Sequence, residues 1–125
     1  MDGERLSRND FGPLESEVMD AVWRAARPVA VREVVDDLNE SRPGPLAYTT
    51  VMTVMSRLAE KDALTRYKVG RGYVYEANAP DAAGIAVKDV LRIYGDVAVA
   101  HFVDVARADP SLRRRLQQML DESDG

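Results

Sequence analysis

One segment of the sequence combines an apolar stripe with an outward face of small polar side chains. Over residues 47–61 the apolar side chains follow the three- and four-residue steps of a packed helix and comprise Val51, Val54, Met55 and Leu58. The opposite face comprises Thr49, Met52, Thr53, Ser56 and Arg57, with Glu60 at its end. Threonine hydroxyls and methyls can contact base edges in a DNA groove, although they discriminate bases less sharply than a bidentate Arg or Asn. The structural alternative is a solvated face of a core helix, but such a face usually carries several Glu and Lys residues. Because Arg57 is the only long donor on this face, recognition of a DNA sequence would depend partly on the sequence-dependent shape of the DNA.

Polar and basic residues flank this segment at positions suited to the phosphate backbone. Tyr48 and Thr50 lie near the expected helix start. The basic candidates for phosphate contacts are Arg42, Lys68 and Arg71. Arg71 is also a candidate for the minor groove. Ordinary solvated charge is the alternative for these three, and Arg66 stays open because the sequence does not fix the orientation of its strand.

Charge is distributed unevenly along the chain. The 125 residues contain 17 Lys and Arg against 21 Asp and Glu, a net charge of −4, which taken alone argues against a polyanionic partner. Residues 41–75, however, hold six basic and two acidic residues and are locally +4. The acidic excess lies in the segments on either side. The part of the chain that carries the polar helix face is thus the part that a nucleic acid would attract.

Several classes of protein are excluded by what the sequence lacks. It has no cysteine and one histidine, so disulfides, thiolate metal sites and cysteine nucleophiles are excluded, and no cofactor or metal is expected. No combination of residues suggests an active site, and an enzyme is not expected. The sequence has neither an apolar run long enough to cross a bilayer nor a signal-peptide core. We expect a cytoplasmic protein without membrane insertion.

The periodicity of the remaining residues predicts the elements that position these side chains. We expect a polar N-terminus over residues 1–10, a helix from Pro13 to about Arg27, an extended link at 29–30, a helix over 31–39 and a loop at 41–45. After the helix at 47–61, the runs 64–69 and 73–77 flank Gly70-Arg71-Gly72 and predict a hairpin. Helical spacing returns over 82–91 and 97–105, with a break at Gly95, and a last helix is expected to be capped by Asp109.

This order of elements predicts a mainly α fold with a small β-hairpin, namely a winged helix-turn-helix domain followed by a helical domain. In such a domain the third helix enters the major groove and the hairpin, or wing, reaches the phosphates. We place the DNA-binding domain at residues 11–79 and the helical domain at 80–125.

Four motifs in this order resemble the BlaI/MecI/CopY family of transcriptional repressors, of the penicillinase-repressor type. They are residues 14–23 (LESEVMDAVW), 31–35 (VREVV), 47–58 (AYTTVMTVMSRL) and 70–75 (GRGYVY). The resemblance is strong over 11–77 and weaker over 81–122. It implies a homodimeric repressor that binds a palindromic double-stranded operator, with control of β-lactamase or antibiotic-response genes as one expectation.

The resemblance also bears on how repression would be relieved. In the β-lactamase branch, a regulatory protease leads to cleavage of an Asn-Phe bond in the C-terminal domain; the matching position here reads His101-Phe102. The copper-responsive branch binds Cu(I) through a cysteine cluster, which this chain lacks.

The C-terminal helices are expected to form the dimer interface. About 45 residues make a poor independent core, so a partner chain would bury their apolar faces. The expected interface comprises Val87, Leu91, Tyr94, Phe102, Leu116 and Leu120.

Other residues receive structural interpretations. Trp23, Tyr67, Tyr73 and Tyr75 could stack on single-stranded bases, but packing of the hairpin against the first helix is preferred. His101 is interpreted as a structural or interface residue. The run Arg113-Arg114-Arg115 is interpreted as a solvated face, with an electrostatic role at the dimer or near DNA as the alternative. The alternative function is a winged helix that binds another protein and not a specific DNA sequence, for which an acidic third helix would be the mark.

Overall fold

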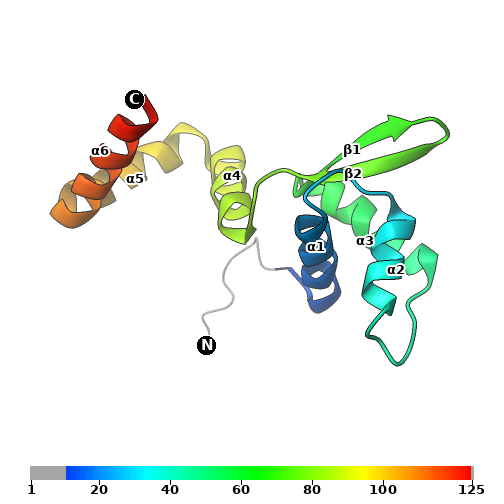
Figure 1. Ribbon diagram of the computed structural model, residues 1–125. Coiled ribbons are helices and arrows are strands. Elements are labelled where there is room, and N and C mark those ends of the chain that lie inside the picture. The colour runs from blue at the N-terminus through cyan, green and yellow to red at the C-terminus, as the bar shows by residue number, and fades with distance from the viewer. Residues whose placement is uncertain (1–10, 125) are drawn as a thin grey trace. The chain divides into compact units, whose positions relative to one another are not determined.

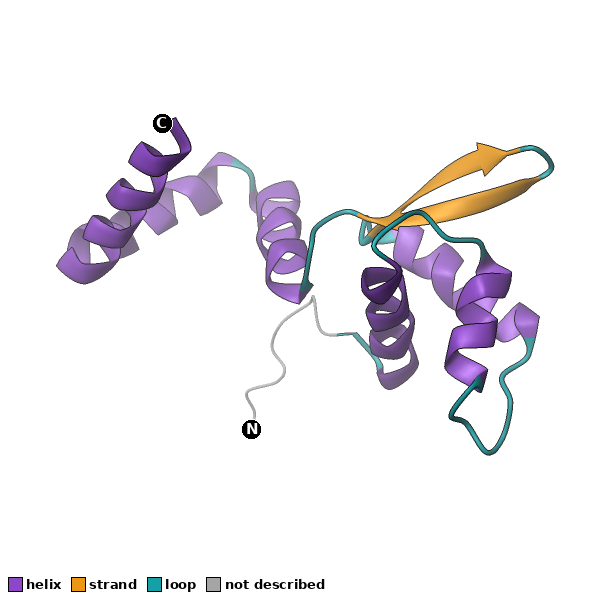
Figure 2. Cartoon of the chain, viewed as in Figure 1, coloured by secondary structure: helices purple, strands orange, loops and turns teal. Residues whose placement is uncertain are grey.

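A computed structural model describes residues 11–124 of the chain, in which six helices and a two-stranded sheet follow one another (Figure 1). The first part consists of α1 (Pro13–Ala25), α2 (Val31–Asn39), α3 (Tyr48–Glu60), β1 (Leu64–Val69) and β2 (Gly72–Ala77). The second part consists of α4 (Ala82–Tyr94), α5 (Asp96–Ala108) and α6 (Pro110–Asp124). The predicted helix–helix–loop–helix–hairpin order, that of a winged helix, is confirmed (Figure 2). Helices α4 and α5 extend a few residues beyond their expected ends.

Helices α1, α2 and α3 and the base of the hairpin enclose one core. The side chains fully removed from solvent include Val18 and Met19 of α1, Met55 and Leu58 of α3, and Leu64 of β1. The apolar stripe predicted on α3 is buried as expected. Burial of this stripe fixes the rotation of α3 about its axis, and therefore determines which side chains it presents outward.

The loop between α2 and α3 is closed by one side chain. The Asn39 amide donates to the carbonyl of Leu46 at 3.1 Å, and its Oδ1 accepts from the Leu46 N–H at 2.8 Å. These two bonds join the end of α2 to the residue that precedes the N-cap of α3, so the proline-containing loop between them leaves the start of α3 fixed.

The hairpin is antiparallel and ends in a two-residue turn. Val69 pairs with Gly72, and Gly70 adopts φ +59°, the left-handed region that favours glycine, as is typical of the first central residue of a type II′ turn. The second strand therefore begins at Gly72, one residue before the predicted start. Residue Val29 also pairs with Tyr75, with N–H···O distances of 2.9 and 2.7 Å, and this bridge confirms the extended link predicted before α2.

The tyrosines of the hairpin do not behave alike. Tyr75 is buried, and Trp23 is half-buried with its Nε1–H donating to the carbonyl of Ala79 at 2.8 Å. Tyr67 and Tyr73 remain 45% and 40% exposed, so the core packing predicted for these two is wrong. The reason is that the hairpin projects beyond the three helices, and only its base reaches the core.

Two compact units divide the chain, one ending at Ala86 and the other beginning at Val87. The first turn of α4 belongs to the first unit: Ile85 is buried in its core, and a Cβ added at Gly84 would lie 2.7 Å from the Cβ of Ala79. The glycine thus permits close packing of this turn on the residue that follows the hairpin.

The second unit buries very little of its own surface. Among residues 87–122, Ala106 is the only buried side chain, although α5 and α6 contact each other. Gly95 separates α4 from α5 with φ +59°, and Asp109 caps α6 by accepting from the N–H groups of Ser111 and Leu112 at 3.1 Å, as predicted. No helix within the described residues is long and apolar enough to span a bilayer.

Candidate nucleic-acid interface

The outward face of α3 carries the side chains that the sequence pattern placed there. Met52, Thr53 and Arg57 are exposed, as are Thr49 and Thr50, whereas Ser56 is half-buried. The only carboxylate on this helix is Glu60, its last residue. Because nothing on the first three turns would repel a phosphate, the helix can approach a polyanion with its hydroxyls, thioether and guanidinium.

One edge of this face borders a groove of about 580 Å³ between α3 and the start of α1. Its α3 wall includes Thr50, Thr53 and Arg57, and its α1 wall includes Glu15. The Glu15 carboxylate is held by the Lys61 ammonium at 2.9 Å and by the N–H of Gly12 at 3.1 Å. An acidic group beside the polar face is thus neutralised by an internal partner.

The pKa of Glu15 reflects this arrangement. Burial alone would raise it, but the hydrogen bonds from Lys61 and Gly12, with the charges of Lys61 and Arg57, outweigh burial and lower the pKa from 4.5. Glu15 therefore remains ionised and paired at neutral pH.

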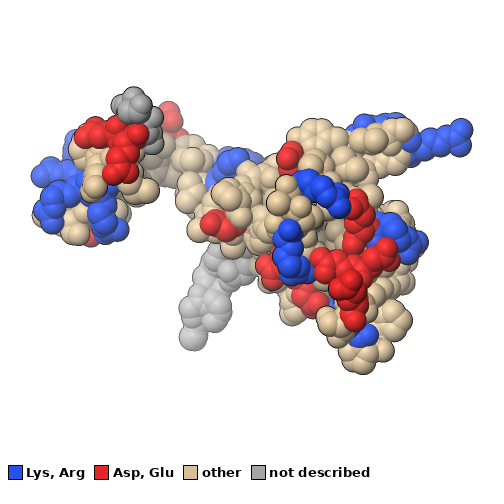
Figure 3. All heavy atoms as spheres, viewed as in Figure 1, with Lys and Arg blue, Asp and Glu red and all other residues tan. Residues whose placement is uncertain are grey.

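The hairpin places its cations in two locations. Arg71 occupies the exposed turn between β1 and β2, and Figure 3 shows Lys and Arg at the far end of the hairpin. Arg66 and Lys68 share one face of β1, and both lie over the ring of Tyr73, at 4.3 and 5.3 Å from its centroid. The strand orientation that left Arg66 open is thereby settled: it faces the same side as Lys68.

The opposite face of the hairpin is different in character. The Tyr67 hydroxyl donates to Oε1 of Glu76 at 3.1 Å, and this bond, with the negative charge of Glu76, raises the pKa of Tyr67 above its usual value. This face also carries Val69, and it presents no Lys or Arg.

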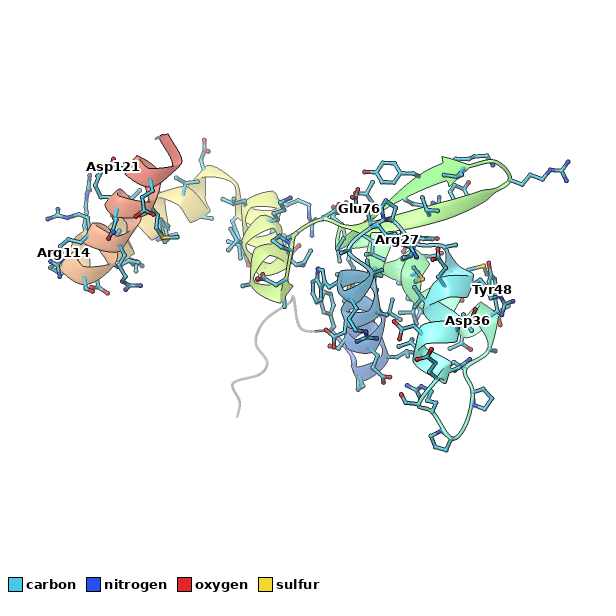
Figure 4. All side chains as sticks on the ribbon, viewed as in Figure 1. Arg27, Asp36, Tyr48, Glu76, Arg114 and Asp121 are labelled. Atoms are coloured by element: carbon cyan, nitrogen blue, oxygen red, sulfur yellow. The ribbon has the colours of Figure 1, made fainter. Side chains whose placement is uncertain are left out.

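A further cation lies at the start of α3. The Arg32 guanidinium, on the exposed side of α2, lies over the ring of Tyr48 at 4.9 Å from its centroid, and Figure 4 shows Tyr48 at this end of α3. The sequence-based predictions gave Arg32 no site role. The two helices meet here only after folding, so no local signal in the sequence would have identified this pair.

Arg42, by contrast, is already engaged within the fold. Its Nη2 lies 2.7 Å from Oε1 of Glu17 on α1, and its Nε is buried without a hydrogen-bond partner. The nearby surface of α1 and α2 is rich in carboxylates, which Figure 3 shows beside the hairpin. Of the predicted phosphate-contacting residues, Arg42 thus has the least favourable surroundings.

The side chains expected at a dimer interface lie on the second unit and are mostly exposed. Val87, Leu91, Tyr94, Phe102 and Leu120 are 44–60% exposed, and Leu116 is half-buried. Further exposed apolar residues surround them in sequence and include Val90, Ile93, Val97, Val99, Val103, Val105 and Met119. His101 is exposed beside Phe102 in the middle of α5. The part of the chain that the structure describes contains no group of three or more metal-ligating side chains.

Comparison with known proteins identifies the family to which the chain belongs. The model of the penicillinase repressor family matches residues 11–122. The chain belongs to the penicillinase repressor family. Among its relatives, the transcriptional regulator BlaI of Mycobacterium tuberculosis (strain H37Rv) is 38% identical over 119 residues, which cover 87% of this chain and 84% of that protein. A penicillinase repressor of Bacillus licheniformis is 34% identical over 114 residues, covering 86% and 87%.

Solved structures of the family and of its fold are also similar to this repressor. The solution structure of monomeric Bacillus licheniformis BlaI in complex with the blaP half-operator is 30% identical, with a TM-score of 0.46, and covers 56% of this chain and 82% of that one. The hsRosR-S4 complex is 15% identical with a TM-score of 0.52, covers 91% and 90%, and shares the fold alone. The family confirms the expectation of a DNA-binding transcriptional repressor and not an enzyme.

Proposed function

We propose that the chain represses transcription as a homodimer that binds a palindromic operator in double-stranded DNA, with the outward face of α3 in the major groove. The observation that carries this proposal is the face itself. Its hydroxyl, thioether and guanidinium groups are exposed, and its one carboxylate lies at the helix end. A winged helix that docked another protein through an acidic α3 would show the opposite charge.

The proposed roles follow from chemistry and position. Thr49, Thr53 and Ser56, with Met52, contact base edges and thymine methyls, and Arg57 is the one long donor on the face. Tyr48, Thr50, Lys68 and Arg71 contact backbone phosphates, and Arg71 at the turn also suits the minor groove. Arg42 joins them at the periphery, where its ion pair with Glu17 limits its contribution.

The proposed dimer rests on the second unit. A helical segment that exposes this many apolar side chains and buries one residue lacks a core of its own. A second copy of the same segment supplies the missing apolar surface in a two-fold arrangement. Burial of the predicted interface residues on α4, α5 and α6 would then stabilise both the unit and the dimer.

Release by proteolysis at His101-Phe102 is not favoured. The bond lies in the middle of α5, where a protease would have to unwind the helix, and the chain lacks the asparagine of the β-lactamase branch. On the basis of the family, the proposed targets are genes of the antibiotic response. The proposed location of the repressor is the cytoplasm.

Selection of DNA by the purified full-length protein tests this function. Duplexes enriched from a random library are expected to contain two inverted half-sites whose centres are about 10 base pairs apart, or a multiple of that spacing. Enrichment of sites without two-fold symmetry would contradict the dimeric mode, and no enrichment over the starting library would contradict sequence-specific repression.

A further inference from the structure

We infer that Tyr73 is a positioning residue for DNA binding, which holds Arg66 and Lys68 together as a two-cation clamp on the phosphate backbone. This inference rests on the proposed function. It assigns a role to a side chain that the sequence pattern placed in the core, and it adds Arg66 to the interface.

The register of the hairpin brings the three side chains together. Lys68 lies directly opposite Tyr73, and Arg66 lies opposite Tyr75, the neighbour of Tyr73 on the same face. Directly opposed side chains contact each other, and diagonal ones are within reach of long or aromatic side chains. A single ring can thus contact both cations, as the centroid distances of 4.3 Å to the Arg66 guanidinium and 5.3 Å to the Lys68 ammonium show.

Burial decreases along this face of the hairpin, which leaves the ring of Tyr73 outside the core. Leu64 and Tyr75, at the base of the face, are buried in the core, whereas Tyr73, Arg66 and Lys68 lie beyond its edge and are exposed. Within the described residues, the Tyr73 hydroxyl has no hydrogen-bond partner, so it is the ring and not the hydroxyl that interacts with the rest of the protein.

The chemistry of the ring distinguishes this arrangement from an ion pair. A carboxylate beside Arg66 and Lys68 would order them but would also cancel their charge. An aromatic face attracts a cation through its quadrupole and leaves the full positive charge available to a phosphate. Among the described residues, neither cation has a carboxylate partner, unlike Arg24, Arg27 and Arg42, which each pair with an acid.

The contacts with the ring lower the entropic cost of ordering Arg66 and Lys68 when DNA binds. Long basic side chains lose rotamer freedom when they bind a phosphate, and part of that loss has already occurred in the free protein if the ring holds them. Because the contacts are to phosphates, the benefit applies to every DNA sequence alike.

Two tyrosine variants of the full-length protein test the clamp, with duplexes enriched from a random library and scrambled duplexes of the same composition as probes. Y73L removes the ring and is expected to weaken binding of both probes by roughly fivefold, the scale of two exposed cation–π contacts. Y73F retains the ring and is expected to bind like the wild type. Y67L, the matched control on the opposite face, removes a similarly exposed tyrosine and is expected to change affinity little.

A double-mutant cycle separates positioning from a structural role. In a protein that carries R66A and K68A, Y73L is expected to cause no further loss, because the ring then has nothing to position. An equal fivefold loss in that background would overturn the inference, as would a loss by Y73F equal to that by Y73L, which would indicate a direct hydroxyl contact with DNA. Wild-type protein that binds neither probe would instead refute the proposed function, and thermal unfolding of each variant reports whether the fold is retained.

Discussion

The guanidinium of Arg32 on α2 lies over the ring of Tyr48 at the first residue of α3, 4.9 Å from the ring centroid. This contact places a positive charge beside the end of α3 at which phosphate contacts are proposed. The hairpin places Arg66, Lys68 and Arg71 on a different element of the same unit. Cations from two separate elements thus accompany the polar face of α3.

R32A is expected to weaken binding of operator and scrambled duplexes by the same factor, about three- to tenfold, and to reduce the salt slope by about one. The loss is uniform because a phosphate carries no sequence information. Titrations of labelled duplexes at several salt concentrations measure both effects. R24A is the control, since Arg24 pairs with Asp37 and is expected to contribute little. A loss confined to the operator would show that Arg32 reads bases.

Substitutions on α3 and at the hairpin turn are expected to differ in kind. T53A removes a hydroxyl and a methyl from the groove face, and should change the ranking of operator variants by up to about 1 kcal/mol at one or two positions. R71A removes a charge from the turn and should weaken all duplexes equally. Competition binding with a set of single-base operator variants measures the ranking. The same uniform loss from both substitutions would refute the assignment of Thr53 to base readout.

The ion pair between Glu15 and Lys61 is expected to make stability depend on pH. Since the folded pKa of Glu15 lies below its ordinary value of 4.5, its contribution is fully present above that pH and is lost as the pH falls through the lowered pKa. Because Lys61 is half-exposed, E15Q should lower the free energy of unfolding at neutral pH by only about 0.5–1 kcal/mol. The difference should shrink as the pH falls below 4.5 and should vanish once Glu15 is protonated in the folded protein.

Urea unfolding at neutral pH and at a series of lower pH values measures this effect. E60Q serves as the control, because Glu60 lies at the exposed end of α3 and forms no ion pair within the described residues. A destabilisation by E15Q that persisted at low pH would indicate lost packing and not a lost charge interaction.

The exposed apolar side chains of the second unit are expected to hold two copies together. F102D introduces a charge into the proposed interface, and sedimentation should show dissociation to monomers at concentrations at which the wild type is dimeric. V69D adds the same charge at an exposed apolar position of the hairpin and should leave the dimer intact. A wild-type protein that sediments as a monomer would contradict the dimeric proposal itself.

Local patterns in the sequence were sufficient to predict the elements. Several element boundaries are set by residues that affect only the backbone close to them in the sequence. They are Pro13, the turn at Gly70, the break at Gly95 and the cap by Asp109. The stripe on α3 likewise determined its outward face, because a helix that buries one side must expose the other. These features need no knowledge of tertiary contacts.

Features that depend on how far an element extends beyond the core were not predictable in this way. Tyr67, Tyr73 and Tyr75 have the same residue type and similar neighbours, yet only Tyr75 lies at the base of the hairpin, where the core can reach it. The pairings of Arg32 with Tyr48 and of Arg42 with Glu17 join residues on different elements. The sequence therefore shows which residues are basic, but it does not predict which of them interact with other side chains in the folded protein.

Sequence-specific binding of duplex DNA is the central claim, and its most direct test is the ratio of two affinities. The full-length wild-type protein is titrated against a duplex enriched from a random library and against a scrambled duplex of the same length and composition, at one near-physiological salt concentration. The enriched duplex is expected to bind at least about a thousandfold more tightly, the lower end of the range for specific DNA-binding proteins. Equal affinity for the two duplexes would contradict the assignment of the α3 face to base readout and, with it, the proposed repressor.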